Sequence, residues 1–119
     1  MDAKGYRQLE VWKKAMDFDE VVYPITREFP DDERYGLTSQ IRRAAVSIPS
    51  NIAEGYGRKS DGDYSRFLSI AQGSLAEVET QLILAVRLKF LAREETVPVW
   101  ESLQEIARML TGLKKSIKK

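Results

Sequence analysis

The chain has 119 residues, of which 19 are basic and 18 acidic, so its net charge of +1 does not make it a general polycation. It contains neither cysteine nor histidine. These two absences exclude disulfides, thiolate metal sites, cysteine nucleophiles, Ser-His-Asp arrangements and the Glu-x-x-His pairs of di-iron helix bundles. We therefore expect no cofactor, no metal and no catalytic residue.

The length predicts a single domain spanning residues 1–119, and 43% hydrophobic residues are enough to build an ordinary core. The sequence has no run of about 18 apolar residues, which a transmembrane helix would need. Its first stretch, MDAKGYRQLEVWKK, lacks the apolar segment of a signal peptide. We expect a cytoplasmic protein that has no membrane contact.

The first predicted helix lies between Leu9 and Phe29. Apolar residues recur there at intervals of three and four, which is typical of one face of a helix. Pro24 lies inside this segment and is expected to kink it. The stretch PDDERYG then ends the pattern. The apolar face consists of Val11, Ala15, Phe18, Val22, Ile25 and Phe29.

The second predicted helix begins near Leu37 or Thr38 and ends near Tyr56, with Gly57 at its end. Pro49 removes one backbone hydrogen bond from its interior, which leaves the carbonyl of Ala45 in need of another partner. We expect Ser47, Ser50 or a water molecule to help. The apolar face consists of Leu37, Ile41, Ala44, Ala45, Ile48 and Ile52.

The third predicted helix is capped by Ser60 or Asp61 and can extend to Leu91. Gly73 lies in its interior, where glycine costs about 1 kcal/mol relative to alanine, so we expect a neighbouring backbone to approach there. The apolar face consists of Tyr64, Phe67, Leu68, Ala71, Leu75, Val78, Leu82 and Ala85.

The fourth predicted helix has Thr96 as its cap and Pro98 in its first turn. Its apolar face consists of Trp100, Leu103, Ala107, Leu110, Leu113 and Ile117. No strand-like alternation of useful length occurs. Four helices that are joined by short turns predict an all-α, antiparallel up-down-up-down four-helix bundle.

Polar residues form a ridge along each of the two central helices. On the second helix they fall within roughly 80° of arc, to one side of the apolar face. On the third helix a similar ridge surrounds Gly73, so the two ridges could share one network in which Arg43 and Arg66 pair with Glu54 and Glu77. The predicted polar network consists of Gln40, Arg43, Ser47, Asn51, Glu54, Arg66, Ser74 and Glu77.

Three interpretations of these ridges compete. A structural network at a subunit interface is favoured, because single Ser, Asn, Gln and Gly residues among the charges are unlike a plain lysine-glutamate surface. A solvated surface and a ligand or nucleic-acid site are the alternatives. Glu54 and Glu77 could in principle do acid-base work, but paired ions explain them equally well.

The stretch LKKSIKK at the C-terminus places four lysines among seven residues. Lysines at a solvated helix end complement the helix dipole, and this interpretation competes with contacts to phosphates. The same two interpretations apply to the basic residues of the second helix and its end. The candidate nucleic-acid contacts are Arg42, Arg58, Lys59, Lys114, Lys115, Lys118 and Lys119.

Two long stretches, LTSQIRRAAVSIPSNIAEGYGR and DYSRFLSIAQGSLAEVETQL, resemble a bacterial four-helix-bundle family that is encoded in intervening sequences of 23S ribosomal RNA genes. The stretches LEVWKKAMDF and IARMLTGLKKSI also fit this family. Its frequent label as a ribosomal protein reflects the position of the gene. The family is also distantly similar to the accessory variability determinant of diversity-generating retroelements, a basic pentamer that binds nucleic acid and a reverse transcriptase.

The resemblance implies a bundle that assembles as a homopentamer and has no recognised catalytic residues. Unlike the retroelement protein, this chain is close to neutral, so any contact with RNA or DNA has to come from local basic patches. The leading hypothesis is a non-enzymatic, homo-oligomeric scaffold or binding protein. The alternative is an adaptor for a protein partner such as an RNA-processing or reverse-transcribing enzyme, in which exposed aromatic residues such as Trp12 or Tyr35 would matter more than lysines.

Overall fold

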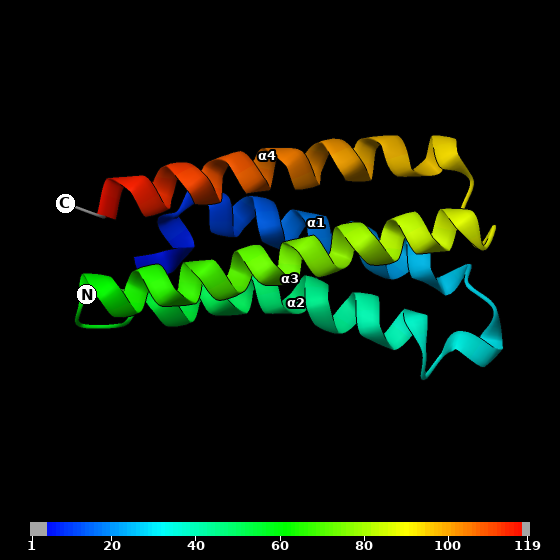
Figure 1. The fold of residues 1–119 in the computed structure, drawn as a ribbon, viewed down its shortest axis with the longest axis horizontal. Helices are drawn as coiled ribbons and strands as arrows, with labels where there is room; N and C mark the ends of the chain where they lie inside the picture. The colour runs from blue at the N-terminus through cyan, green and yellow to red at the C-terminus, as the bar shows by residue number, and fades with distance from the viewer. Residues whose placement is uncertain (1–4, 118–119) are drawn as a thin grey trace.

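The structure is a computed structural model and describes residues 5–117. Four long helices run alternately up and down along the bundle (Figure 1), and the described residues contain no strand. This arrangement confirms the predicted all-α fold. The helices are α1 (Glu10–Arg27), α2 (Leu37–Tyr56), α3 (Asp61–Arg87) and α4 (Arg93–Ile117), with short 3-10 helices η1 (Gly5–Gln8) and η2 (Asp31–Glu33) before α1 and α2.

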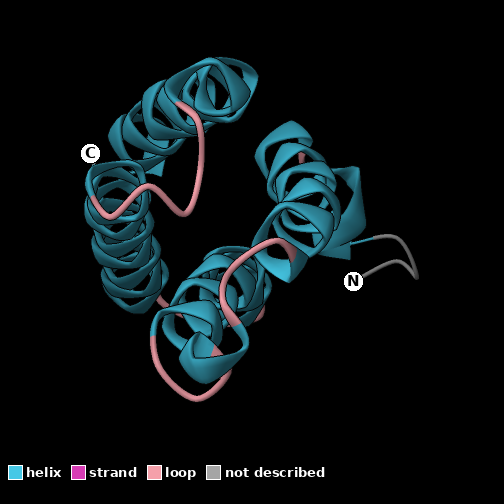
Figure 2. Ribbon diagram, turned by 90° about the vertical axis from the view of Figure 1, so that its right-hand side faces the viewer, coloured by secondary structure: helices cyan, strands magenta, loops and turns pink. Residues whose placement is uncertain are grey.

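The helices lie side by side along a bundle of 44 × 22 × 20 Å. Figure 2 shows the bundle from one end. α2 and α3 pack most extensively, α1 packs against α2, and α4 packs against both α3 and α1. The turn η1 packs against α2 as well as α1. Neighbours in sequence are therefore neighbours in space, as short connections require.

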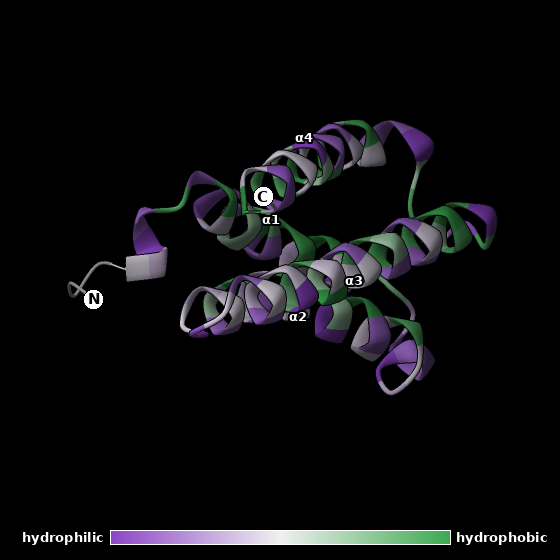
Figure 3. Cartoon of the chain, turned by 60° about the vertical axis from the view of Figure 1, so that its left-hand side comes forward, coloured by the Kyte–Doolittle hydropathy of each residue, from purple (hydrophilic) through white to green (hydrophobic). Residues whose placement is uncertain are grey.

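α1, α2 and α3 bury most of the apolar face that their periodicity predicts, whereas α4 buries only Leu103 and Leu110 of its predicted face. It also buries Val99 and Ile106, which the prediction missed. Figure 3 shows hydrophobic and hydrophilic residues alternating along each helix, the pattern of a helix with one face in a core. All four helices contribute fully buried side chains, which include Val22 of α1, Ile41, Ile48 and Ile52 of α2, Leu68 and Val78 of α3, and Leu103, Ile106 and Leu110 of α4.

The start of α3 follows the prediction, while the start of α4 does not. Ser60 caps α3, and its hydroxyl accepts a hydrogen bond from the backbone N–H of Asp63 at 3.1 Å. α4 begins at Arg93, three residues before the predicted cap. The carboxylate of Glu95 accepts the N–H of Ala92 at 2.8 Å at this helix start, and the hydroxyl of Thr96, the predicted cap, instead donates to the carbonyl of Arg93 at 2.6 Å. Pro98 consequently lies in the second turn.

The end of α3 is a left-handed turn at Lys89, whose φ is 67°. The N–H of Phe90 donates to the carbonyl of Ala85 at 2.8 Å, and the N–H of Lys89 donates to that of Val86 at 3.0 Å. This pair of bonds is a Schellman motif, and it ends the helix at Arg87, earlier than the predicted limit of Leu91.

The close approach between α2 and α3 occurs at Gly55. A Cβ on Gly55 would lie only 2.8 Å from the Cβ of Phe67 and 3.2 Å from the carbonyl oxygen of Tyr64. At Gly73, by contrast, a Cβ would meet no described atom within 4 Å. The prediction of a close backbone approach at Gly73 is therefore wrong within the chain, because this glycine faces outward.

Candidate functional site

A small part of the predicted polar network forms between α2 and α3. The hydroxyls of Ser47 and Ser74 share a hydrogen bond of 2.7 Å. The side-chain amide of Asn51 donates to the carbonyl of Ser47 at 2.8 Å and to its hydroxyl at 2.9 Å. Ser74 is buried and the other two are half-buried. The hydroxyl of Ser47 therefore interacts with Ser74 of α3 and with Asn51. Pro49, which has no N–H to donate to the carbonyl of Ala45, is buried and lines a groove together with residues of α1.

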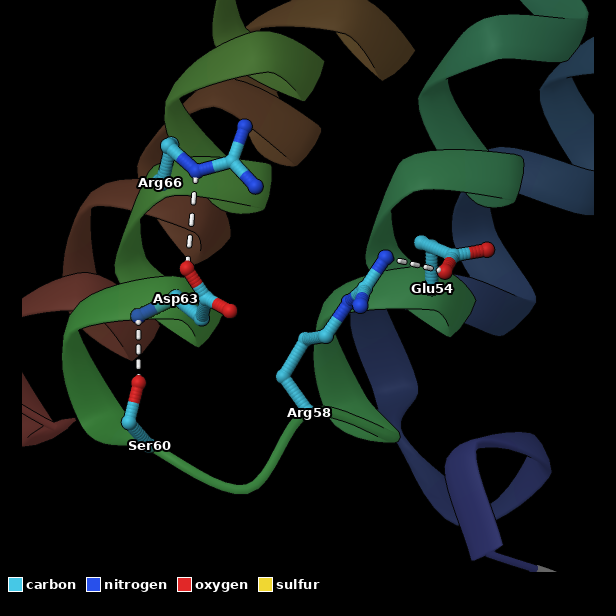
Figure 4. A network of polar contacts seen from close by, with 5 residues as sticks. All are labelled: Glu54, Arg58, Ser60, Asp63 and Arg66. Atoms are coloured by element: carbon cyan, nitrogen blue, oxygen red, sulfur yellow. Dashed lines mark hydrogen bonds and ion pairs between the residues drawn. The ribbon is translucent and has the colours of Figure 1, made fainter.

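The charged residues of the ridges pair locally instead of with one another. Glu54 accepts from Arg58 at 2.7 Å, and Arg66 lies 3.6 Å from Asp63 (Figure 4). The predicted pairing of Arg43 and Arg66 with Glu54 and Glu77 is therefore wrong within this chain, because partners one helical turn away are closer. The remaining ridge residues Gln40, Arg43 and Glu77 are exposed.

Two of the predicted basic segments meet at one end of the bundle. Figure 1 places the turn between α2 and α3 at the same end as the last turns of α4. Lys114 of α4 bridges to α3, where its ammonium donates to Ser69 at 2.7 Å and to Gln72 at 3.3 Å. Lys59 and Lys115 are exposed. The candidates Lys118 and Lys119 lie outside the described residues.

Two arginines of this end share one aromatic ring. The guanidinium carbons of Arg58 and Arg66 lie 4.7 and 4.5 Å from the centre of the Phe67 ring. Such contacts hold both cations close to the helices while each also pairs with a carboxylate. We name the set Arg58, Lys59, Arg66, Lys114 and Lys115 the basic end.

Arg42 lies apart from the basic end and has an internal role. Its Nε donates to the hydroxyl of Thr26 at 2.8 Å, and its Nη2 donates to the carbonyl of Tyr23 at 3.2 Å. Its guanidinium also covers the ring of Tyr23 at 4.6 Å. These groups belong to the last turns of α1, where a cation complements the helix dipole. Arg42 therefore fastens α2 to α1 through two of its donors.

The periodicity analysis missed a buried carboxyl group on α1. Asp19 is only 9% exposed, and its Oδ1 has no hydrogen-bond partner among the described residues. Burial raises the pKa of Asp19 to about 8, so this carboxyl is protonated at neutral pH. The signal was present in the sequence, since Asp19 lies next to Phe18 and four residues after Ala15, on the buried face of α1.

Asp19 lines a groove of about 680 Å³ between α1, α2 and η1. The walls of the groove include Trp12 and Tyr23 of α1 and Pro49 of α2. The ring of Tyr6 in η1 packs edge-to-face on that of Trp12, with 5.3 Å between the ring centres. The sequence suggested two exposed aromatic residues for an adaptor, Trp12 and Tyr35. In the structure Trp12 is half-buried and lines this groove. Tyr35 is 88% exposed.

A second groove of about 560 Å³ lies between the C-terminal half of α3 and the N-terminal half of α4. It is mainly apolar and includes Ile83, Val97 and Trp100, of which the first two are about half exposed. No helix among the described residues is both long and apolar enough to cross a membrane.

Comparison with known proteins places this fold in context. The model of the 23S rRNA-intervening sequence protein family matches residues 7–112. A crystal structure of a protein of unknown function from the S23 ribosomal protein family of Bacteroides thetaiotaomicron is 25% identical and superposes with a TM-score of 0.81. The match covers 88% of this chain and 98% of that one. No curated protein sequence matches the chain. With its four-helix fold and a family match over nearly its whole length, this chain belongs to the 23S rRNA-intervening sequence protein family.

Proposed function

We propose that the protein is a non-enzymatic, cytoplasmic scaffold that forms a homo-oligomer and holds RNA or DNA at its basic end. The observation that carries self-association is the outer face of α3. Ile70, Leu84 and Leu88 are each 40–49% exposed there, and they lie on the same side of the helix as the open Gly73. A helix that is apolar on a second face usually has a second partner to cover it.

A neighbouring copy is the partner that best suits this face. Glu77, which is exposed, lies on this same face between the apolar residues and offers a hydrogen-bonding group to a neighbouring copy. The number of copies proposed, five, rests on the resemblance of the central motif to ring-forming bundles. Light scattering at micromolar concentration is expected to give the mass of five chains. A monomer mass at every concentration would exclude self-association.

Nucleic acid is the proposed ligand of the basic end. Lys59 in the turn before α3 and Lys115 of α4 are exposed, and Lys114 joins α4 to α3, so phosphates can meet several cations at once. The carboxylates of Glu54 and Asp63 pair with the two arginines, which leaves the lysines as the freer charges. Binding is therefore expected to be moderate in strength and indifferent to sequence.

The test is fluorescence anisotropy with labelled RNA and DNA at several salt concentrations. Replacing Lys59 and Lys115 by glutamine is expected to lower the slope of log K against log salt by one to two, because each neutralised phosphate releases about one counterion. The matched control replaces Arg34 and Arg108, which are exposed elsewhere, and it removes the same charge. Equal slopes in both variants would move the contact away from the basic end.

A protein-protein adaptor is the second candidate function. The groove beside Asp19 favours it, because an open groove with aromatic walls suits a protein side chain better than a phosphate.

A further inference from the structure

We propose that the groove between α1 and α2 binds a lysine or arginine side chain of a protein partner, with Asp19 as the acceptor at its base. We call this site the Asp19 groove. The inference goes beyond the scaffold and nucleic-acid function and does not depend on it, since the groove and the basic end share no residue.

The first argument is the unpartnered carboxyl. Asp19 is almost fully buried, yet its Oδ1 receives no hydrogen bond from the chain. Leaving a buried acceptor unsatisfied costs about 1–3 kcal/mol, and more when it is charged. The α2 wall of the groove cannot relieve this cost at Pro49, which has no N–H, and Ser50 makes no hydrogen bond to Asp19. Oδ1 itself has almost no accessible surface, so a donor from outside the chain satisfies the carboxyl only when the Asp19 side chain turns toward the groove that it lines.

The second argument is the charge of the groove. Its titratable residues besides Asp19 are Glu20, Tyr23 and Arg27 of α1 and Tyr6 of η1, whereas α2 contributes no ionisable group. Neither Glu20 nor Arg27 pairs with Asp19 in the structure. With Asp19 ionised, the groove holds two carboxylates and one guanidinium, so it favours a cation and disfavours a phosphate.

The third argument is the chemistry of the walls. Trp12, Tyr23 and Tyr6 present aromatic rings, and rings of this kind attract ammonium and guanidinium groups. Met16, Val46 and Pro49 supply apolar surface. Lysine and arginine combine an apolar stem with a charged head, so one side chain can contact these walls and still reach Asp19.

Binding of such a side chain is coupled to a proton. Free Asp19 is protonated at neutral pH, because burial raises its pKa to about 8. A bound cation favours the ionised form, so binding releases a proton to solvent. Affinity is therefore expected to be low at pH 6 and to rise up to about tenfold per pH unit until it levels above pH 8, while the lysine of the partner remains charged.

The test uses two labelled helical peptides of 14 residues, on the order of the length of a typical short helix. Both consist of alanine, leucine and glutamine, and they differ only in carrying lysine or norleucine at the centre. Anisotropy against the intact protein is expected to show the lysine peptide binding about tenfold tighter at pH 9 and about equally with norleucine at pH 6. An equal affinity of the two peptides at pH 9 would overturn the proposal.

Asp19→Asn is expected to abolish the preference for lysine at pH 9, and Asp17→Asn, an exposed neighbour on α1, is expected to leave it intact. If Asp19→Asn fails to fold, the pH dependence of the wild type decides, because a merely apolar groove would prefer norleucine at every pH. Light scattering of Asp17→Asn and Asp19→Asn tests whether the groove is instead occupied by a second copy of this chain. A smaller assembly for Asp19→Asn alone, with no lysine preference in the wild type, would assign the groove to a second copy and overturn the proposal.

Discussion

Ser47 of α2 and Ser74 of α3 face each other across the closest helix pair of the bundle, with 2.7 Å between their hydroxyl oxygens. Asn51 donates to Ser47 as well, so three short polar side chains satisfy one another without a charge. A neutral network of this size can lie in a packed helix contact at little cost.

Ser74→Ala tests this contact. Removing the buried hydroxyl is expected to lower the free energy of unfolding by about 1 kcal/mol, because a typical hydrogen bond contributes 0.5–1.5 kcal/mol. Urea unfolding of Ser74→Ala, Ser47→Ala and the double variant forms a double-mutant cycle, in which coupling is expected. Ser50→Ala, at an exposed position of α2, serves as control and is expected to change the free energy of unfolding little. Strictly additive single changes would show that the two serines do not interact.

The two glycines Gly55 and Gly73 are expected to respond in opposite directions to alanine. Gly55→Ala places a Cβ 2.8 Å from that of Phe67, so α2 and α3 have to separate, and overpacking of this kind costs about 1–3 kcal/mol. Gly73→Ala enters open space and is expected to stabilise the isolated chain by up to about 1 kcal/mol through helix propensity.

Thermal unfolding measures both glycine changes, and light scattering adds a second readout. If the face of α3 around Gly73 contacts another copy, Gly73→Ala is expected to reduce the assembly mass even though it favours the helix. A stabilised variant of unchanged mass would place Gly73 outside any interface. A wild-type melting temperature for Gly55→Ala would contradict the close packing of α2 and α3.

Lys89→Gly is expected to stabilise the protein. Lys89 has a φ of 67° in the Schellman motif after α3, a conformation that glycine adopts without the steric cost of a side chain. We expect a gain of about 1 kcal/mol, on the order of the left-handed penalty. Lys89→Ala removes the same charge and keeps the Cβ, so it is the control and is expected to give no such gain. Equal unfolding free energies for both variants would refute a conformational origin.

The stability of the protein is expected to depend on pH through Asp19. Because burial raises its pKa from 3.8 to about 8, the folded state binds a proton that the unfolded state has released over this range. The stabilising effect of the proton is complete below pH 3.8 and is lost as the pH rises through 8. Asp19→Asn cannot ionise, so its melting temperature relative to the wild type is expected to increase from pH 4 to pH 8 by several degrees.

Differential scanning fluorimetry between pH 4 and pH 9 measures this difference directly. Asp17→Asn, exposed on the same helix, is expected to differ from the wild type by a constant amount. A constant difference for Asp19→Asn as well would mean that its carboxyl is ionised throughout this range and accessible to water.

Much of the fold follows from local rules that act along the chain. The intervals of three and four between apolar residues predicted most of the buried faces of α1, α2 and α3 and part of that of α4, and α2 ends at Tyr56 with Gly57 after it, as the pattern indicated. The cap at Ser60 was equally readable, because a serine before acidic residues satisfies the first backbone donors. Such features depend on neighbours in sequence, and the order of the residues determines them.

The tertiary structure decided the features that depend on which helix faces lie opposite each other. Periodicity placed Ser47 and Ser74 on two polar ridges, but only the packed helices show that their hydroxyls bond to each other across α2 and α3. The sequence predicted Arg42 as a surface cation, whereas in the structure its guanidinium donates to Thr26 in the last turn of α1. Asp19 appeared as one acid among many, and its burial and its unpartnered oxygen became visible only in the packed bundle. Burial, distance and an unsatisfied acceptor are properties of pairs of elements, so they arise only when the helices pack.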